Sequence, residues 1–238
     1  MLRAGQMKID GILFDKDGTL FDFRATWDAW AAKLIDELSE GNADLAAAIA
    51  HHIAFDLPKA QFRPESPVIA GTGREAAECV ARAMPGVDLD ALEARMNASA
   101  AAAPLAPAVP LSPLLQSLAA QGLSLGVMTN DSEMGAKAHL RGAGIYELFD
   151  FVAGFDSGYG AKPDAAPLLA FSEQMHLTPA RVAMVGDSAH DLIAGRAAGM
   201  VTVGVLTGIA EAADLAPLAD VVLPDIGHLP EWLNSASN

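Results

Sequence analysis

The sequence predicts an α/β protein, in which a doubly wound parallel sheet forms the core and a helical domain is inserted into it. Short apolar runs alternate with helical segments from residue 111 onwards, as in repeated βα units. Residues 21–103, in contrast, contain almost no strand signal. One apolar run, residues 12–14, precedes this helical stretch and leads directly into Asp15 and Asp17. The first strand of the sheet is therefore expected to be separated from the others by the insert.

Composition sets the outer limits on function. The chain has 238 residues, 52% of them hydrophobic, and a mean hydropathy of +0.27, which supports a packed core. A net charge of −15 and a pI near 4.6 argue against nucleic acid or an anionic membrane as partner. Cys79 is the only cysteine, which fits a reducing, cytoplasmic setting. No run of 18 apolar residues predicts a membrane span, and residues 1–8 are too short and polar for a signal peptide.

The insert is expected to begin with two helices. Apolar side chains recur at helical spacing between residues 27 and 38, and Thr26 is a candidate N-cap for this first helix. Asn42 is expected to cap a second, alanine-rich helix that runs through Phe55. Both helices carry apolar side chains, so each must pack against a neighbour within the insert.

Two further helices complete the insert. Residues 75–84 form the third, which ends at a Pro-Gly pair, and the fourth begins at Asp88 or Asp90. Prolines then mark a stiff return segment, namely Pro104, Pro107 and Pro110. The expected domains are a core of residues 1–20 and 108–238 and a cap of residues 21–107.

The second part of the core follows the return segment. Its first helix is expected to start at Ser112 as N-cap with Pro113 at the next position, and Gly122 ends it. The later elements are strand 123–128, helix 133–141, strand 149–153, helix 167–175, strand 181–185, helix 192–198 and strands 201–205 and 221–223. This alternation predicts a Rossmann-like sheet, in which ligands bind at the carboxyl ends of the strands.

Polar side chains gather at those strand ends. Asp15 and Asp17 follow the first strand, and two carboxylates so close together are costly to bury without a cation. A hard dication such as Mg2+ prefers oxygen ligands. The other strand ends and one glycine-rich loop supply Thr129, Asn130, Lys162, Asp187 and Asp191. Taken alone, each of these polar residues is typical of a helix cap, a solvated lysine or a loop. All of them together, in this order along the chain, indicate one site.

This order of motifs resembles the haloacid dehalogenase superfamily of phosphohydrolases. Its four motifs match DKDGTL at 15–20, the threonine of VMTND at 127–131, Lys162 in GAKPD, and GDSAHD at 186–191. The resemblance covers nearly the whole chain, because the helical insert lies where the family carries a small α-helical cap. It is nearest to the phosphoglycolate-phosphatase-like branch.

The resemblance implies a role for each matched residue. Asp15 is the nucleophile and Asp17 the general acid and base, and the family's dehalogenases lack an acid at this second position, so Asp17 favours phosphoryl transfer. The phosphoryl group is bound by Thr129, Asn130 and Lys162, and Thr129 and Lys162 also count as catalytic residues. The Mg2+ ion is held by Asp15, Asp187 and the backbone carbonyl of Asp17. Asp191 is an outer-shell residue or orders its loop.

Several cap and motif residues have open roles. Lys16 is expected to turn to solvent, with an extra cation near the cap or substrate as the alternative. Arg24 is expected to pair with an acidic cap residue, or else to bind a substrate carboxylate, and Arg74 is the candidate for substrate selection. His190 reads as an exposed spacer inside the last motif. The pair Trp27 and Trp30 reads as cap packing, with a substrate wall as the alternative.

We therefore expect a cytoplasmic, Mg2+-dependent phosphatase with an aspartyl-phosphate intermediate. Its partner would be a small phosphorylated metabolite, phosphoglycolate or a similar phosphomonoester, and the chain would be a monomer or homodimer. Three alternatives remain open: a phosphosugar mutase similar to β-phosphoglucomutase, which sugar-bisphosphate dependence would reveal; a pyrophosphatase or nucleotidase; and a non-catalytic metabolite-binding protein, which would release no phosphate from any monoester.

Overall fold

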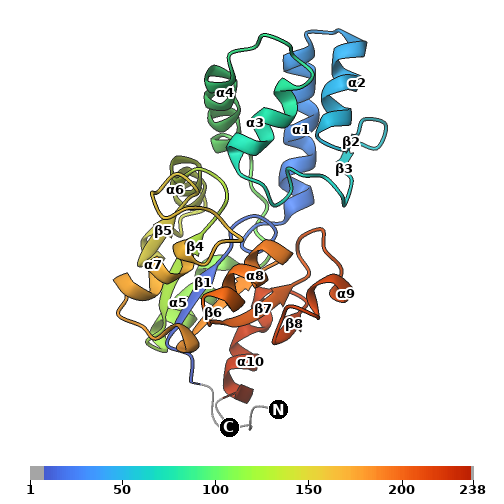
Figure 1. The fold of residues 1–238 in the computed structure, drawn as a ribbon. Helices are drawn as coiled ribbons and strands as arrows, with labels where there is room; N and C mark the ends of the chain where they lie inside the picture. Colours follow the sequence, from blue (N-terminus) through green and yellow to red (C-terminus); the bar gives the residue numbers. More distant parts are fainter. Residues whose placement is uncertain (1–7, 237–238) are drawn as a thin grey trace.

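The chain folds into an α/β core with a block of helices above its sheet (Figure 1). The computed structural model describes residues 8–236. Residues 1–7, where the sequence predicts no signal peptide, lie outside the described residues. Six strands form one sheet in the order β5-β4-β1-β6-β7-β8, and every neighbouring pair is parallel. The predicted doubly wound α/β fold is therefore confirmed.

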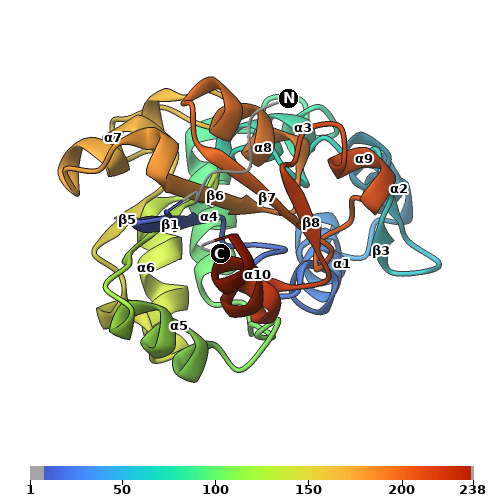
Figure 2. The same ribbon diagram turned by 90° about the horizontal axis from the view of Figure 1, so that it is seen from below.

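The strands and helices of the core alternate along the chain. The strands are β1 (Gly11–Phe14), β4 (Ser124–Met128), β5 (Phe151–Ala153), β6 (Val182–Gly186), β7 (Val201–Val205) and β8 (Val221–Leu223). The helices are α5 (Leu111–Ala120), α6 (Glu133–Gly142), α7 (Ala166–Gln174), α8 (Ala189–Ala197), α9 (Ala212–Leu215) and α10 (Leu229–Ala236), with short 3-10 turns at Tyr146–Leu148, Pro179–Arg181 and Ile226–His228. Helices α5, α6 and α10 cover one face of the sheet, and α7 and α8 cover the other (Figure 2).

Strand β1 lies at the centre of the sheet and is buried on both faces. Ile12 and Phe14 pack into the apolar cluster that includes side chains of α5, α6 and α10. Leu13 points the other way and packs with Phe171 of α7 and Ala194 of α8. A strand buried on both faces needs apolar side chains at every position, which explains the unbroken apolar run that predicts it.

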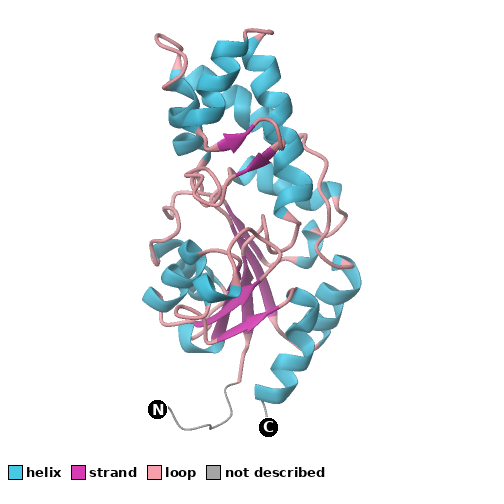
Figure 3. Ribbon diagram, turned by 90° about the vertical axis from the view of Figure 1, so that its right-hand side faces the viewer, coloured by secondary structure: helices cyan, strands magenta, loops and turns pink. Residues whose placement is uncertain are grey.

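The helical block has its own apolar core. It consists of α1 (Phe23–Ser39), α2 (Ala43–His52), α3 (Gly73–Ala81) and α4 (Leu89–Ala101), with a small antiparallel hairpin of β2 (Phe55–Asp56) and β3 (Gln61–Phe62). Figure 3 shows this hairpin lying between the helical block and the sheet. Buried side chains of α1 to α4 and of the hairpin form one cluster, separate from the two clusters that flank the sheet.

Three local expectations are corrected by the structure. The first helix is capped by Asp22, whose carboxylate accepts from Ala25 N at 2.8 Å, and Thr26 is buried inside the helix. The second helix, capped by Asn42 as predicted, ends at His52. Phe55 lies instead in the hairpin, where its ring packs edge-on against that of Phe62 at 5.1 Å.

The third correction concerns the first core helix. It begins at Leu111, with Pro110 at its cap position and no side-chain cap, so Ser112 lies within its first turn.

The helical block is joined to the core by two neighbouring chain segments. Asp22 N donates to Ala106 O at 2.8 Å, and Ala108 N donates to Leu20 O at 2.9 Å. These paired segments place the helical block directly over the carboxyl end of β1.

Candidate active site

The residue after β1 lies at the centre of the candidate site. Phe14 pairs with Val127 of β4 and with Val185 of β6, so the three strands end at the same level. Asp15 follows, and its backbone N–H donates to Val185 O at 2.8 Å. Thr129 follows β4 and Asp187 follows β6. The sheet topology therefore brings together residues that lie more than a hundred positions apart.

A buried cluster of three carboxylates surrounds this point. Oxygen atoms of Asp15, Asp187 and Asp191 lie within 4.8 Å of one another. Lys162 Nζ donates to Asp15 at 2.5 Å and to Asp191 at 2.6 Å. All four side chains are buried. Asp191, expected as an outer-shell residue, thus lies inside the cluster, and it also orders its loop by accepting from Ser188.

The glycine of the first motif is required by the same close packing. Gly18 has a φ of +87°, and a Cβ there would lie 2.3 Å from a carboxylate oxygen of Asp187. Any side chain would meet both a strained backbone and the Asp187 carboxylate. The turn after β1 can therefore approach the cluster only with glycine at this position.

Burial controls the charges of this cluster. Burial raises the pKa of Asp15 to about 7, against the opposing pull of Lys162 and with help from Asp191 and Asp17. Burial also raises the pKa of Asp187 well above its usual value, and the Asp15 and Asp191 charges add to that effect. For Lys162, burial alone would lower the pKa, but Asp15 and Asp191 outweigh it and raise the pKa. Three carboxylates around one ammonium form an all-oxygen, electron-rich donor set that fits Mg2+.

The raised pKa values predict a pH-dependent metal affinity. A Mg2+ ion held here would need deprotonated carboxylates, and burial raises the pKa of Asp15 to about 7, so its binding would release protons below that pH. We expect the apparent Mg2+ affinity, measured by calorimetry, to fall by at least about tenfold between pH 8 and pH 6. An affinity unchanged over this range would contradict the assignment of Asp15 as a ligand.

The same shift fixes the sign of the pH effect on metal-free stability. The folded protein keeps a proton on Asp15 that the unfolded chain releases, so this carboxyl contributes stability at low pH. That contribution is lost as the pH rises from 3.8 to about 7. In EDTA, the free energy of unfolding of wild type relative to Asp15→Asn should therefore fall over that range. A rising difference would contradict the burial of Asp15.

Lys16 is completely buried, contrary to the expectation that it turns to solvent. Its ammonium lies 2.6 Å from Asp17 and 3.1 Å from Asp131, hydrogen-bonds His139 Nδ1 at 2.9 Å, and lies over the Trp27 ring at 5.4 Å. Burial alone would lower the pKa of Lys16, but the two carboxylates outweigh it. Asp17, Asp131 and the indole face of Trp27 stabilise the buried Lys16 charge. Lys16 is therefore an extra cation near the cap, as the alternative expectation states.

The neighbouring histidine is neutral and has one defined tautomer. Burial, and next the charge of Lys16, lower the pKa of His139. Its Nδ1 accepts from the Lys16 ammonium, so its Nε2–H donates to Ala100 O in the helical block at 2.8 Å. Lys16 thereby holds one oxygen of Asp17, while the other oxygen, Asp17 Oδ1, has no hydrogen-bond partner. That free oxygen is available for proton transfer.

Thr129 and Asn130 have different tasks in the structure. Thr129 lines the cavity, and its Oγ1 accepts from Asp131 N at 3.1 Å, which leaves its own O–H free to donate. Asn130 accepts from Lys162 N and donates to Lys162 O, both at 2.9 Å. The second N–H of its amide donates to Ala70 O at 2.9 Å. Asn130 therefore positions Lys162, which differs from its expected role as a phosphate ligand.

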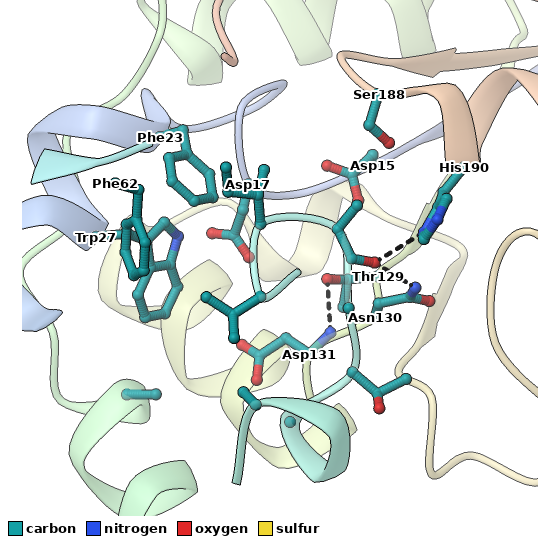
Figure 4. A pocket seen from close by; sticks show the side chains of 18 of the residues that line it. Asp15, Asp17, Phe23, Trp27, Phe62, Thr129, Asn130, Asp131, Ser188 and His190 are labelled. Atoms are coloured by element: carbon teal, nitrogen blue, oxygen red, sulfur yellow. Dashed lines mark hydrogen bonds between the residues drawn. The ribbon is translucent and has the colours of Figure 1, made fainter. Parts of the chain in front are cut away.

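The carbonyl of Ala70 connects the helical block to the core. It accepts from both Asn130 Nδ2 and His190 Nδ1, the latter at 3.0 Å (Figure 4). His190 is half-buried, so the expectation of a solvent-exposed spacer is corrected. Two core side chains thus hold one loop of the helical block over the site.

The two arginines expected to select the substrate lie away from the site. Arg24 pairs with Asp28 at 3.6 Å, as the favoured reading of this residue predicts. Arg74 pairs with Asp90 at 2.5 Å and with Glu93 at 2.9 Å. Neither side chain lines the cavity. Acidic neighbours within the helical block engage both arginines, and substrate selection by them stays a prediction.

A cavity of about 130 Å3 lies between the core and the helical block. Its floor carries the polar cluster, including Asp15, Asp17 and Lys162. Figure 4 shows Phe23, Trp27 and Phe62 grouped on the side of Asp17, with Asp15 and Ser188 across from them. The tryptophans that read as cap packing thus also form a wall of the cavity. Cap packing was the favoured interpretation and a substrate wall the alternative, and the contact with a substrate stays a prediction.

Comparison with known proteins identifies related chains. Residues 9–199 match the model of the haloacid dehalogenase-like hydrolases. A phosphoglycolate phosphatase of Neisseria meningitidis is 39% identical over 120 residues, which is 50% of this chain and 49% of the relative. The phosphoglycolate phosphatase of Escherichia coli is 37% identical over 117 residues, which is 48% of this chain and 46% of the relative. The chain thus spans about half the length of the curated relatives it matches.

Solved structures match over nearly the whole chain. A predicted phosphoglycolate phosphatase from Haemophilus somnus has a TM-score of 0.71 at 20% identity and covers 96% of this chain and 99% of its own. A putative β-phosphoglucomutase from Thermotoga maritima has a TM-score of 0.67 at 19% identity and covers 95% and 99%. At these identities the likeness establishes the fold, including the helical block, and leaves open which reaction is catalysed.

Proposed function

Because the chain belongs to the haloacid dehalogenase-like hydrolases, we propose that it is a Mg2+-dependent phosphatase of a small phosphomonoester. The observation that carries the proposal is the juxtaposition of Asp15, Asp17 and Lys162 at the floor of one cavity. Phosphoryl transfer through an enzyme-bound intermediate requires three groups: a nucleophilic carboxylate, a second carboxylate with a free oxygen, and a buried ammonium.

In the described part of the chain, residues 8–236, no helix has the length and apolar character of a membrane span.

The first half of the reaction forms a phosphoenzyme. A carboxylate oxygen of Asp15 attacks phosphorus, and the bond from phosphorus to the leaving oxygen breaks. Asp17 donates a proton to that oxygen, so the alcohol leaves neutral. Lys162 and the free Thr129 O–H stabilise the charge on the phosphoryl oxygens.

The second half regenerates the enzyme. Asp17, now deprotonated, takes a proton from water while the water oxygen attacks phosphorus. The bond from phosphorus to Asp15 breaks, and inorganic phosphate leaves. Asp15, Asp187 and the Asp17 backbone carbonyl would hold Mg2+, with Asp191 beside them. When bound, Mg2+ supplies positive charge at the phosphoryl oxygens.

The helical block is proposed to act as a cap. Its Ala70 carbonyl is held by Asn130 and His190, and its aromatic side chains roof the cavity. Closure of the cap over the substrate would exclude bulk water from the phosphoryl group.

Phosphate release tests the proposal. The purified protein is assayed with 2-phosphoglycolate, sugar phosphates, a nucleotide, pyrophosphate and 4-nitrophenyl phosphate, in Mg2+ and in EDTA. We expect release from at least one monoester in Mg2+ and release at the level of the enzyme-free blank in EDTA. Equal rates in EDTA would overturn the metal dependence, and no release from any compound would favour a non-catalytic binding protein.

A further inference from the structure

The upper half of the cavity, on the side of the helical block, is built mainly from apolar side chains, with Thr72 and Asn97 as its polar members. Aromatic rings from α1 and the hairpin line it together with aliphatic side chains of α3 and α4; the main contributors are Phe23, Trp27, Trp30, Phe62, Val80 and Met96. All of these but Trp30 are buried, and Trp30 is half-buried. The upper half is continuous with the polar floor, so whatever is esterified to a phosphoryl group bound there must enter this apolar space.

The charges around the cavity disfavour an anionic leaving group. Among the described residues that line it, Lys162 is the only lysine or arginine, and its ammonium is already engaged by Asp15 and Asp191 on the floor. Arg24 and Arg74 are paired elsewhere. The Lys16 ammonium, which lies over the Trp27 ring, is likewise engaged, by Asp17 and Asp131. A carboxylate on the leaving group would therefore lie among apolar walls with no unpaired cation beside it, which carries a large desolvation cost. A sugar would find few polar partners on the walls of the helical block, where Thr72 and Asn97 are the polar side chains that line the cavity.

The aromatic walls are fixed in place by their own contacts. The rings of Trp27 and Trp30 pack edge-to-face at 5.2 Å, and those of Phe23 and Phe62 pack edge-to-face at 6.0 Å. Trp30 Nε1 donates to Ser99 Oγ at 3.1 Å, so this N–H is not available to a ligand. The Trp30 indole consequently offers apolar ring surface to the cavity, and aromatic ligands pack well against such surface.

The size of the cavity favours a leaving group of about one ring. An apolar cavity of about 150 Å3 in another protein holds one benzene molecule. The present cavity measures about 130 Å3 and must also admit the phosphoryl group at its floor. The cavity is also partly open to solvent, so a single ring on a short linker suits this space better than the base and ribose of a nucleotide.

We propose that the substrate is a phosphomonoester whose leaving group is an uncharged, apolar, ring-bearing alcohol. This inference rests on the phosphatase function proposed above and specifies what that site accepts. It also distinguishes this chain from the phosphoglycolate phosphatases it resembles, because glycolate is small and anionic. The apolar half of the cavity contributes binding to the ring, while the phosphoryl group and the chemistry remain on the floor.

A matched pair of esters tests the inference. 2-Phenylethyl phosphate and ethyl phosphate leave as alcohols of similar acidity, so the ratio of their kcat/KM values reports burial of the ring and not the chemistry. We expect 2-phenylethyl phosphate to exceed ethyl phosphate by about 10- to 100-fold, the factor that burial of one phenyl ring gives. We also expect it to exceed 2-phosphoglycolate by at least about tenfold. A ratio near one, or preference for 2-phosphoglycolate, overturns the inference and leaves the phosphatase function standing.

Variants of one wall residue connect the preference to the cavity. Trp30→Ala should lower kcat/KM for 2-phenylethyl phosphate by about tenfold and change that for ethyl phosphate by less than about twofold. Trp30→Leu, which keeps an apolar side chain, should lose less. The control is Trp232→Ala on α10, in the core away from the cavity, which should leave the ratio of the two esters unchanged. Equal losses on both esters in Trp30→Ala would overturn the assignment of this wall.

Failure of the phosphatase function itself is detected separately. If no ester is hydrolysed, binding of 2-phenylethylphosphonate and of ethylphosphonate is measured by calorimetry in Mg2+. Tighter binding of the phenyl compound by about tenfold or more supports the apolar site without catalysis. Equal affinities, or no binding of either compound, overturn the inference together with the function.

Discussion

Asp15→Asn is expected to reduce kcat for phosphate release by at least about 10^4-fold, which is the scale of loss when a nucleophile of a coupled catalytic set is removed. The amide has the shape of the carboxylate but cannot attack phosphorus to form the acyl phosphate. Steady-state phosphate release with saturating ester and Mg2+ measures the effect. The variant should remain folded, because its side chain still offers Lys162 an oxygen in place of the acceptor at 2.5 Å.

The control for this prediction is a nearby acid outside the site. Asp164 lies two residues after Lys162, is exposed, and does not line the cavity. Asp164→Asn carries the same chemical change and should alter kcat by less than about twofold. If Asp15→Asn keeps a tenth or more of the wild-type rate with the same Mg2+ dependence, Asp15 is not the nucleophile.

Lys162→Met is expected to destabilise the metal-free protein by about 3–5 kcal/mol at pH 8. Its ammonium is the partner of Asp15 and Asp191, and Asp187 lies beside them, so the variant leaves a buried carboxylate cluster without its cation. Urea unfolding in EDTA gives the free energy of unfolding. At pH 5 the loss should be smaller, because the carboxyls with raised pKa values then bind protons instead.

An exposed lysine provides the matched control. Lys33 is 73% exposed and pairs with Glu37 one helical turn away, so Lys33→Met should change the free energy of unfolding by less than about 0.5 kcal/mol. Mg2+ should restore part of the stability lost in Lys162→Met, since it supplies the missing positive charge. Unchanged stability of Lys162→Met at pH 8 would show that the cluster is not as buried as described.

The fold was predictable because its signals are local. An unbroken apolar run identifies β1 as a strand buried on both faces, and the capping side chain of Asn42 identifies the start of α2. The hairpin in the helical block was missed because its strands are two residues long and rest on the contact between Phe55 and Phe62. So short a strand leaves no periodicity in the sequence.

The site residues divide in the same way. Strand ends converge in a parallel sheet, so the positions of Asp15, Thr129 and Asp187 followed once the strands were placed. The burial of Lys16 could not be foreseen, because one of its partners, His139, lies 123 positions away and belongs to a helix. A lysine after a strand looks the same in sequence whether or not such partners exist.

The apolar roof was hidden for a related reason. Trp30 sits on one helix, and its spacing says only that one face of that helix is apolar. Whether that face meets another helix or a cavity depends on the tertiary packing of the block over the sheet. The partners of Arg74 were equally hidden, since Asp90 and Glu93 lie on α4 and engage its guanidinium outside the cavity lining.

The central claim is that Asp15 carries the phosphoryl group between two half-reactions governed by Asp17. It is tested most directly with Asp17→Asn and 4-nitrophenyl phosphate in Mg2+, followed by stopped flow and by mass spectrometry of the acid-quenched protein. Nitrophenolate is a good leaving group that needs no proton, so the first half should proceed while the second stalls.

We expect a burst of nitrophenolate equal to the enzyme concentration, then slow turnover, with one phosphoryl group on the peptide that contains Asp15. The double variant that also carries Asp15→Asn should give neither burst nor label. A burst with the phosphoryl group on another residue, or steady release with no labelled protein, would contradict the account.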